Sequence, residues 1–170
     1  MKRSTAYAAS RAWRTARCGL RVAAIATIAL VAYSEGMAIW RDNASVERWF
    51  DVRSIHVADA VHGDCPVLTV DRVIRQRVRG TWVATLRKEA PGGGFVAYSS
   101  ASGSVDYQPG AVYPTPLYLW WWMNWPRGDC SRIEPGVYIL TTQWIMSPVG
   151  YPPKEEFEAS NTFTIRPRSQ

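Results

Sequence analysis

The sequence predicts a mainly β fold, an antiparallel β-sandwich of about seven strands, behind one N-terminal membrane-targeting helix. Two observations lead to this fold class. Residues 51–167 contain short alternating apolar runs separated by Gly, Pro, Asn and Asp, without a long helical period. Residues 20–40 form one apolar stretch behind a basic flank. A small barrel is the alternative arrangement of the same strands.

Residues 20–40 have the length and composition of a membrane span. Positions 22–40 would extend about 28 Å as a helix, close to the hydrocarbon thickness of about 30 Å. Glu35 lies near the outer end, where a carboxylate can reach the interface. We therefore expect a transmembrane signal-anchor over residues 20–40, with the lipid bilayer as its partner.

Four residues are expected at the membrane interface. Arg17 and Arg21 lie at the inner end of the span, where long basic side chains reach the headgroups. Trp40 lies at the outer end, where interfacial aromatic residues gather. Trp49 follows in a short stalk, where it would pack under the domain or lie on the bilayer.

The charge distribution predicts the orientation of this span. The net charge is +6, and residues 1–34 hold six of the 20 basic residues and none of the 14 acidic ones. The remaining 14 basic and 14 acidic residues cancel, so the excess belongs to the flank. This bias predicts a single-pass inner-membrane protein with a cytoplasmic N-terminus and a periplasmic domain. It argues against nucleic acid as a partner, because such a domain carries its basic surplus in the fold.

A cleaved signal peptide is the main alternative to an anchor. Its apolar core would be residues 22–31, and Ala32-Tyr33-Ser34 offers small residues for cleavage near Ser34. An organellar transit peptide also fits a flank with Arg and Ser and without acidic residues.

Four regions follow from this organisation. They are a basic cytoplasmic flank without order (1–19), the signal-anchor (20–40), a membrane-proximal stalk (41–50) and the exported domain (51–167). Asn43 is expected to cap a helical turn in the stalk.

Seven strand-like runs are expected in the exported domain. Arg79 and Gly80 are interpreted as the break of a hairpin, and residues 101–110 and 147–156 as loops. The runs are residues 52–57, 67–78, 81–88, 95–100, 116–125, 135–146 and 157–165.

Part of this domain resembles immunoglobulin-like and fibronectin-type sandwiches. Residues 134–140, Glu-Pro-Gly-Val-Tyr-Ile-Leu, resemble the start of their penultimate strand, which implies that the Tyr138 hydroxyl ties back to the corner. Residues 160–165 resemble their final strand, and Trp82 matches the buried core Trp. The chain departs from the antibody pattern because Cys130 precedes the penultimate strand, so its bridge would join a loop to a strand start.

The cysteines indicate the redox compartment. Cys65 and Cys130 lie in the exported part and are expected to form a disulfide, whereas Cys18 lies in the flank. Two buried thiols, or a zinc site with His56 and His62, are the alternatives; the Cys-x-x-Cys spacing of strong zinc motifs is missing.

The run 116–125 contains three consecutive tryptophans. Alternation along a strand would send Trp120 and Trp122 to the core, and Trp121 and Met123 outward as a contact surface. A strand buried on both faces is the alternative.

Signals for catalysis are weak, and no cofactor or metal is expected. His62 and Cys65 could form a Cys-His hydrolase site, and Glu155 with Glu156 a carboxylate pair, but neither has a flanking motif. Asp59, Asp64 and Asp71 lack the spacing of a calcium loop.

The expected function is therefore a non-enzymatic, membrane-anchored envelope protein whose domain binds another protein as an adaptor. In this organisation it resembles small envelope proteins of bacteria and phages. A secreted or periplasmic carbohydrate- or ligand-binding module, released near Ser34, is the alternative, and a hydrolase is a remote one.

Overall fold

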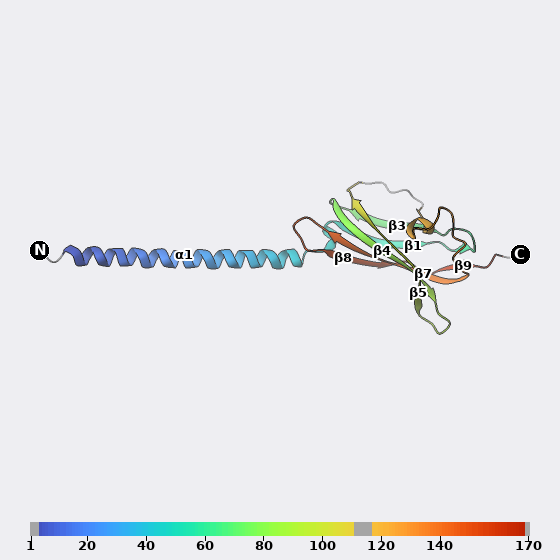
Figure 1. The fold of residues 1–170 in the computed structure, drawn as a ribbon, viewed down its shortest axis with the longest axis horizontal. Coiled ribbons are helices and arrows are strands. Elements are labelled where there is room, and N and C mark those ends of the chain that lie inside the picture. Colours follow the sequence, from blue (N-terminus) through green and yellow to red (C-terminus); the bar gives the residue numbers. More distant parts are fainter. Residues whose placement is uncertain (1–3, 111–116, 169–170) are drawn as a thin grey trace. The chain divides into compact units, whose positions relative to one another are not determined.

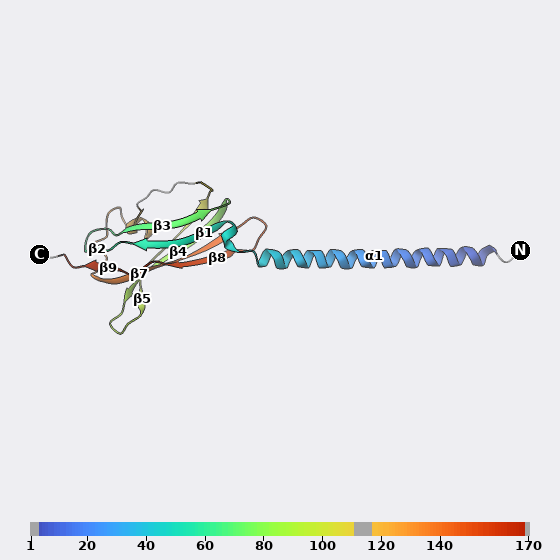
Figure 2. The ribbon, with the colours of Figure 1, turned by 180° about the vertical axis from the view of Figure 1, so that it is seen from behind.

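The computed structural model describes residues 4–110 and 117–168, with side chains in the N-terminal helix from residue 23 onward. The chain divides into two compact units, Met1–Ala44 and Ser45–Gln170. The first unit is helical and the second contains the strands (Figures 1 and 2).

Helix α1 runs from Ser4 to Asp42. Its segment Ala23–Asp42 has a mean hydropathy of 1.5 and is long and apolar enough to cross a membrane. The expectation of a flank without order is wrong, because the helix begins at Ser4. Residues 4–18 are rich in Ala and Arg and contain neither Gly nor Pro, and this composition favours helix.

The stalk contains the expected helical turn with a different cap. The 3₁₀ helix η1 (Val46–Arg48) is capped by Ser45, whose hydroxyl accepts a hydrogen bond from the Glu47 N–H. Asn43 instead donates through Nδ2 to the Ile39 carbonyl at the end of α1. The prediction of Asn43 as the N-cap is therefore wrong.

The strands of the described residues form two sheets. One has the order β1-β3-β6, from β1 (Phe50–Val57), β3 (Val67–Ile74) and β6 (Leu117–Tyr118). The other has the order β2-β9-β7-β4-β5, with β8 also paired to β7; its members are β2 (Ala60–Val61), β4 (Val78–Glu89), β5 (Phe95–Tyr107), β7 (Gly136–Ser147), β8 (Lys154–Ala159) and β9 (Phe163–Arg166).

Aromatic side chains from both sheets build the core. The ring of Phe50 on β1 lies 4.8 Å from that of Tyr107 on β5 and 5.7 Å from that of Trp144 on β7. Trp82 and Leu86 on β4 are buried on the face that alternation predicts. The two sheets therefore pack face to face around these rings, as Figure 1 shows for β1 and β3 over β4 and β7.

The pairing is mixed, not purely antiparallel as expected. β2 pairs with β9 in parallel, and Ile55 forms a parallel bridge with Ser160.

The expected strand 157–165 is divided into β8 and β9, because Asn161 lies between them and does not take part in the strand pairing. Its side chain binds Val57 twice, accepting from the N–H at 2.9 Å and donating to the carbonyl at 3.0 Å.

Two glycines expected at breaks lie inside strands. Gly80 pairs within β4, and a Cβ there would lie 2.6 Å from Sδ of Met146. Gly103 pairs within β5, and a Cβ there would lie 2.8 Å from the ring of Trp82. Glycine stands at both positions because a large neighbouring side chain leaves no room for a Cβ, and not because the backbone turns there. The expected hairpin of residues 67–78 with 81–88 is wrong, because β3 and β4 lie in different sheets and residues 75–77 connect the two sheets. β5 continues through the expected loop to Tyr107.

Candidate contact site

The tryptophan run forms a helical turn, not the expected strand. After β6, residues Leu119–Trp122 form the short helix α2. The Met123 N–H donates to the Leu119 carbonyl, and the turn ends at Asn124, whose φ is 54°. A left-handed Asn is a common way to end a helical turn. The strand alternation therefore does not apply to this run.

Helical spacing changes which side chains face the core. Trp122 is buried as expected, and Trp121 is 46% exposed as expected. Met123 is only 2% exposed, so its prediction as an outward contact residue is wrong. Trp120 is half-buried instead of fully buried. Residues 119, 122 and 123 share one helical face, and this places Met123 with Leu119 and Trp122 in the core.

Three aromatic residues remain on the outside, and we call Tyr118, Trp120 and Trp121 the aromatic surface. Tyr118 is 41% exposed, and its ring stacks on that of Trp120 with 6.5 Å between the centroids. The side chain of Asn124 donates to the Ser102 carbonyl at 3.1 Å. This bond fixes the turn beside β5, which among the described strands pairs with β4 alone.

Trp122 packs in the core beneath the aromatic surface and supports it. Its ring lies 6.1 Å from that of Trp82 and 6.3 Å from that of Trp144. A cavity of about 20 Å³ lies among these rings, Trp121 and their neighbours, with room for roughly one water molecule. Among the described residues, Nε1 of Trp122 has no hydrogen-bond partner. Packing, not hydrogen bonding, therefore holds Trp122.

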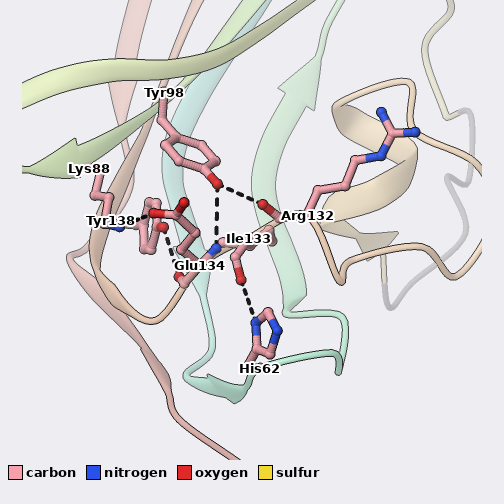
Figure 3. A network of polar contacts seen from close by, with 7 residues as sticks. All are labelled: His62, Lys88, Tyr98, Arg132, Ile133, Glu134 and Tyr138. Carbon is pink, nitrogen blue, oxygen red and sulfur yellow. Dashed lines mark hydrogen bonds and ion pairs between the residues drawn. The ribbon is translucent and has the colours of Figure 1, made fainter.

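A second cluster surrounds the segment before β7, and we call residues 130–138 with their side-chain partners the polar corner (Figure 3). The Tyr138 hydroxyl donates to the Glu134 carbonyl at 2.8 Å, which is the bond that the Pro-Gly-x-Tyr motif implies. The Tyr98 hydroxyl donates to the Arg132 carbonyl at 2.6 Å, and Nδ1 of His62 lies 2.8 Å from the Ile133 carbonyl. Three side chains thus hold three consecutive carbonyls.

The half-buried Lys88 on β4 supplies a positive charge at this corner. Nζ of Lys88 lies 2.6 Å from Oε2 of Glu134 and about 6 Å from the ring centroids of Tyr98 and Tyr138. The hydrogen bond from Lys88 lowers the pKa of the Glu134 carboxyl. Burial raises the pKa of Tyr138 above its ordinary value. Its hydroxyl is therefore protonated at neutral pH and can donate this hydrogen bond.

The expected disulfide between Cys65 and Cys130 is present and closes the polar corner from one side. Cys65 therefore carries no thiolate in the oxidised protein, so the Cys-His hydrolase hypothesis lacks its nucleophile there. His62 lies at the corner through its contact with the Ile133 carbonyl. The side chain of Cys18 lies outside the described residues.

The other sequence candidates do not form a common site. Glu155 and Glu156 alternate along β8 and so point to opposite faces. The Asp59 carboxylate accepts from the Thr164 N–H, whereas Asp64 pairs with Arg168. Within the described parts of the chain, no three His, Cys, Asp or Glu side chains come together as metal ligands would.

The four expected interface residues have different outcomes. Trp40 is 47% exposed on α1. Trp49 is only 6% exposed and packs edge-on against Tyr151 at 4.8 Å, so its placement on the bilayer is wrong and the packing alternative holds. The side chains of Arg17 and Arg21 lie outside the described residues.

Comparison with protein-family models, curated proteins and solved structures finds no match to this chain.

The helical turn at α2 was missed by sequence reasoning, although one signal for it exists. The run 116–125 is apolar but contains no Val, Ile or Thr, the β-branched residues that favour strands. Its apolar character alone cannot separate a buried strand from a helical turn.

Proposed function

We propose that this protein is a single-pass envelope protein, with its N-terminus inside, whose β domain is a non-enzymatic module that binds another protein. Support for the anchor comes from the apolar segment Ala23–Asp42 together with the basic residues before it. Both are features that set orientation during membrane insertion.

The observation that carries the binding role is the exposure of Trp121 on a rigid support. Its ring is 46% exposed, while its neighbours Trp122 and Met123 are buried. Tryptophan and tyrosine often supply most of the binding free energy at protein interfaces. Their contribution is larger when the side chain is already held in place, because less conformational entropy is lost on binding. The aromatic surface meets both conditions, because α2 is fixed by Trp122 below and by Asn124 at its end.

The strand β5 extends this surface. It is a long strand whose outer edge pairs with none of the other described strands, and its residues 95–105 carry no charge. Charged side chains are a common protection against pairing at such edges. A protein partner could therefore contact the aromatic surface with side chains and the neighbouring edge with its backbone.

An immunoglobulin-like organisation of the domain is part of this proposal. The Tyr138 hydroxyl bond and the buried Trp82 between two sheets support it. The parallel pair of β2 with β9 is a departure from the usual pattern.

Photocrosslinking in cells tests the binding role. A photoreactive phenylalanine at position 121 should give an adduct with one protein species. The same residue at Phe157 is the matched control, because that side chain is 63% exposed on β8, away from the aromatic surface. Equal adducts at both positions, or none at position 121, would contradict the proposal. Retention on glycan that depends on Trp121, without a protein adduct, would favour the carbohydrate-binding alternative.

A further inference from the structure

One end of the β domain is formed where its own chain begins. The Arg75 N–H donates to the Trp49 carbonyl at 2.9 Å, and Nε of Arg75 donates to the Glu47 carbonyl at 2.9 Å. These bonds join η1 to the turn between β3 and β4. The packing of Trp49 on Tyr151 joins both to the loop between β7 and β8. We call these three segments the entry end.

Two neighbouring hollows open on the entry end. The first measures about 280 Å³ and the second about 480 Å³, and Arg77 and Val149 line both. The first is completed by Arg48, Trp49, Gln76 and Tyr151, the second by Val78, Arg79, Asp106 and Ser147. The first hollow thus has two guanidinium groups and no carboxylate in its lining. The second has two guanidinium groups and one carboxylate.

The charge of Arg77 persists beside its acidic partner. Nε and one terminal nitrogen of Arg77 donate to Asp106, which raises the pKa of the guanidinium. The other terminal nitrogen takes no part in that pair, and a guanidinium has five N–H donors. Asp51 on β1 forms ion pairs with Arg75 and Arg53.

An aliphatic side chain projects between these arginines. Val149 is 98% exposed at the tip of the turn in which the Tyr151 N–H donates to the Pro148 carbonyl. Interfacial amphipathic helices combine apolar side chains that enter the headgroup boundary with basic side chains beside them. Val149 and the arginines offer the same combination at a turn. A soluble anion would be bound by the arginines alone and would not use Val149.

The entry end follows α1 directly in the sequence. The helix ends at Asp42, and only Asn43 and Ala44 precede Ser45. Resting on the proposed anchoring by α1, we propose that the entry end binds the phosphate of an anionic phospholipid through Arg48 and Arg77, with Val149 inserted between headgroups. Arginine suits this role because its planar fork binds phosphate oxygens in pairs.

The test uses the full chain with Cys18→Ser in lipid nanodiscs. An environment-sensitive fluorophore is attached at Val149→Cys, or at Val96→Cys as the control. Val96 is 56% exposed and pairs with Lys88, at the end of β4 opposite to Arg77. Discs contain phosphatidylcholine alone or with phosphatidylglycerol. We expect a blue shift and quenching by spin-labelled lipid at position 149 and not at position 96, stronger with phosphatidylglycerol.

The arginine variants connect this signal to the hollows. Arg48→Gln, and separately Arg77→Gln, should reduce the response at position 149 several-fold, whereas Arg132→Gln in the polar corner should not. Both residues are exposed, and thermal melting checks that each variant folds. Unchanged signals in both arginine variants would overturn the proposal.

Two further outcomes separate this proposal from others. Glycerol phosphate added to phosphatidylcholine discs should leave the probe unchanged; a response equal to that of phosphatidylglycerol would assign the hollows to a soluble phosphate and overturn the lipid assignment. A chain that does not co-purify with the discs contradicts the anchoring and this proposal together. A chain that co-purifies, but whose probe at 149 behaves like that at 96, contradicts this proposal alone.

Discussion

The aromatic turn (117–125) and the polar corner (130–138) are neighbouring segments of similar length that are held in opposite ways. In the polar corner, Tyr98, Tyr138 and His62 contact backbone carbonyls, and a disulfide fixes one end. In the aromatic turn, Leu119, Trp122 and Met123 are buried, and the side chain of Asn124 donates a hydrogen bond to the neighbouring strand β5. The packing of large side chains therefore holds the aromatic turn in place, whereas hydrogen bonds from single polar atoms hold the polar corner.

This difference between the two segments indicates which exposed aromatic side chains are free of a structural role and can bind a partner. Each aromatic side chain of the polar corner has a structural task in the loop. In the aromatic turn the task falls on the buried residues, so the exposed ring of Trp121 is not needed for the fold. Four predictions test this comparison.

The largest expected effect is at Trp122. Trp122→Ala should lower the free energy of unfolding by about 3–5 kcal/mol, because it leaves a cavity between Trp82 and Trp144. Trp121→Ala, a half-exposed neighbour, should cost less than about 1 kcal/mol. Thermal and denaturant melting of the two variants side by side measures both values. If Trp121→Ala melts as low as Trp122→Ala, the contact-site interpretation of the turn fails.

Loss of the disulfide should come next. Replacing Cys65 and Cys130 by Ser removes a bridge across a sequence separation of 65, at a cost of about 2–5 kcal/mol. Non-reducing peptide mapping of native protein should find these two residues bonded, and denaturant melting should find the variant less stable. Free alkylation of both thiols in protein from an oxidising compartment would contradict the pairing.

A single hydroxyl of the polar corner should have a smaller, measurable effect. Tyr138→Phe keeps the buried ring but leaves the Glu134 carbonyl without its donor, and should cost about 0.5–1.5 kcal/mol. Tyr118→Phe, in the exposed part of the aromatic turn, is the matched control and should be close to neutral. Equal melting temperatures of the two variants would show that the corner does not depend on this bond.

The smallest expected effect is the pH dependence of the Lys88–Glu134 pair. The pKa of Glu134 is lowered in the folded state by the hydrogen bond from Lys88. The stabilisation is therefore complete above the unfolded pKa of about 4.3 and is lost as the pH falls through the folded value. The difference in melting temperature between wild type and Glu134→Gln should be present at neutral pH and disappear once the pH lies below the lowered pKa of Glu134. A constant difference across this range would assign the effect to packing.

Sequence reasoning predicted the features that depend on local pattern. The alternation of Trp82, Ala84 and Leu86 places them in the core, and the motif before Tyr138 places its hydroxyl on Glu134. It failed where tertiary neighbours decide. Gly80 and Gly103 look like breaks until the side chains of Met146 and Trp82 are placed beside them.

The candidate site was predicted in part, for a reason that is also physical. Exposure of Trp121 was correct although the strand behind the prediction was wrong, because both geometries separate position 121 from position 122. The prediction for Met123 was wrong because a strand, with a period of 2, would turn this side chain outward, whereas a helix, with a period of 3.6, turns it to the core. The entry end was not predicted at all, since Arg48, Arg77 and Val149 come from three segments far apart in the chain.

The two hydrogen bonds between Asn161 and Val57 have a consequence for the order of folding. The two residues are 104 positions apart, and the Asp59–Thr164 and Asp64–Arg168 contacts span similar separations. A chain that emerges N-terminus first can form the β1–β3 and β4–β5 hairpins early, because their partners are close in sequence. The first strand, however, stays open on its other side until Ser160 and Asn161 have been synthesised. Resistance to proteolysis should therefore appear only after the residues beyond position 160 have been added.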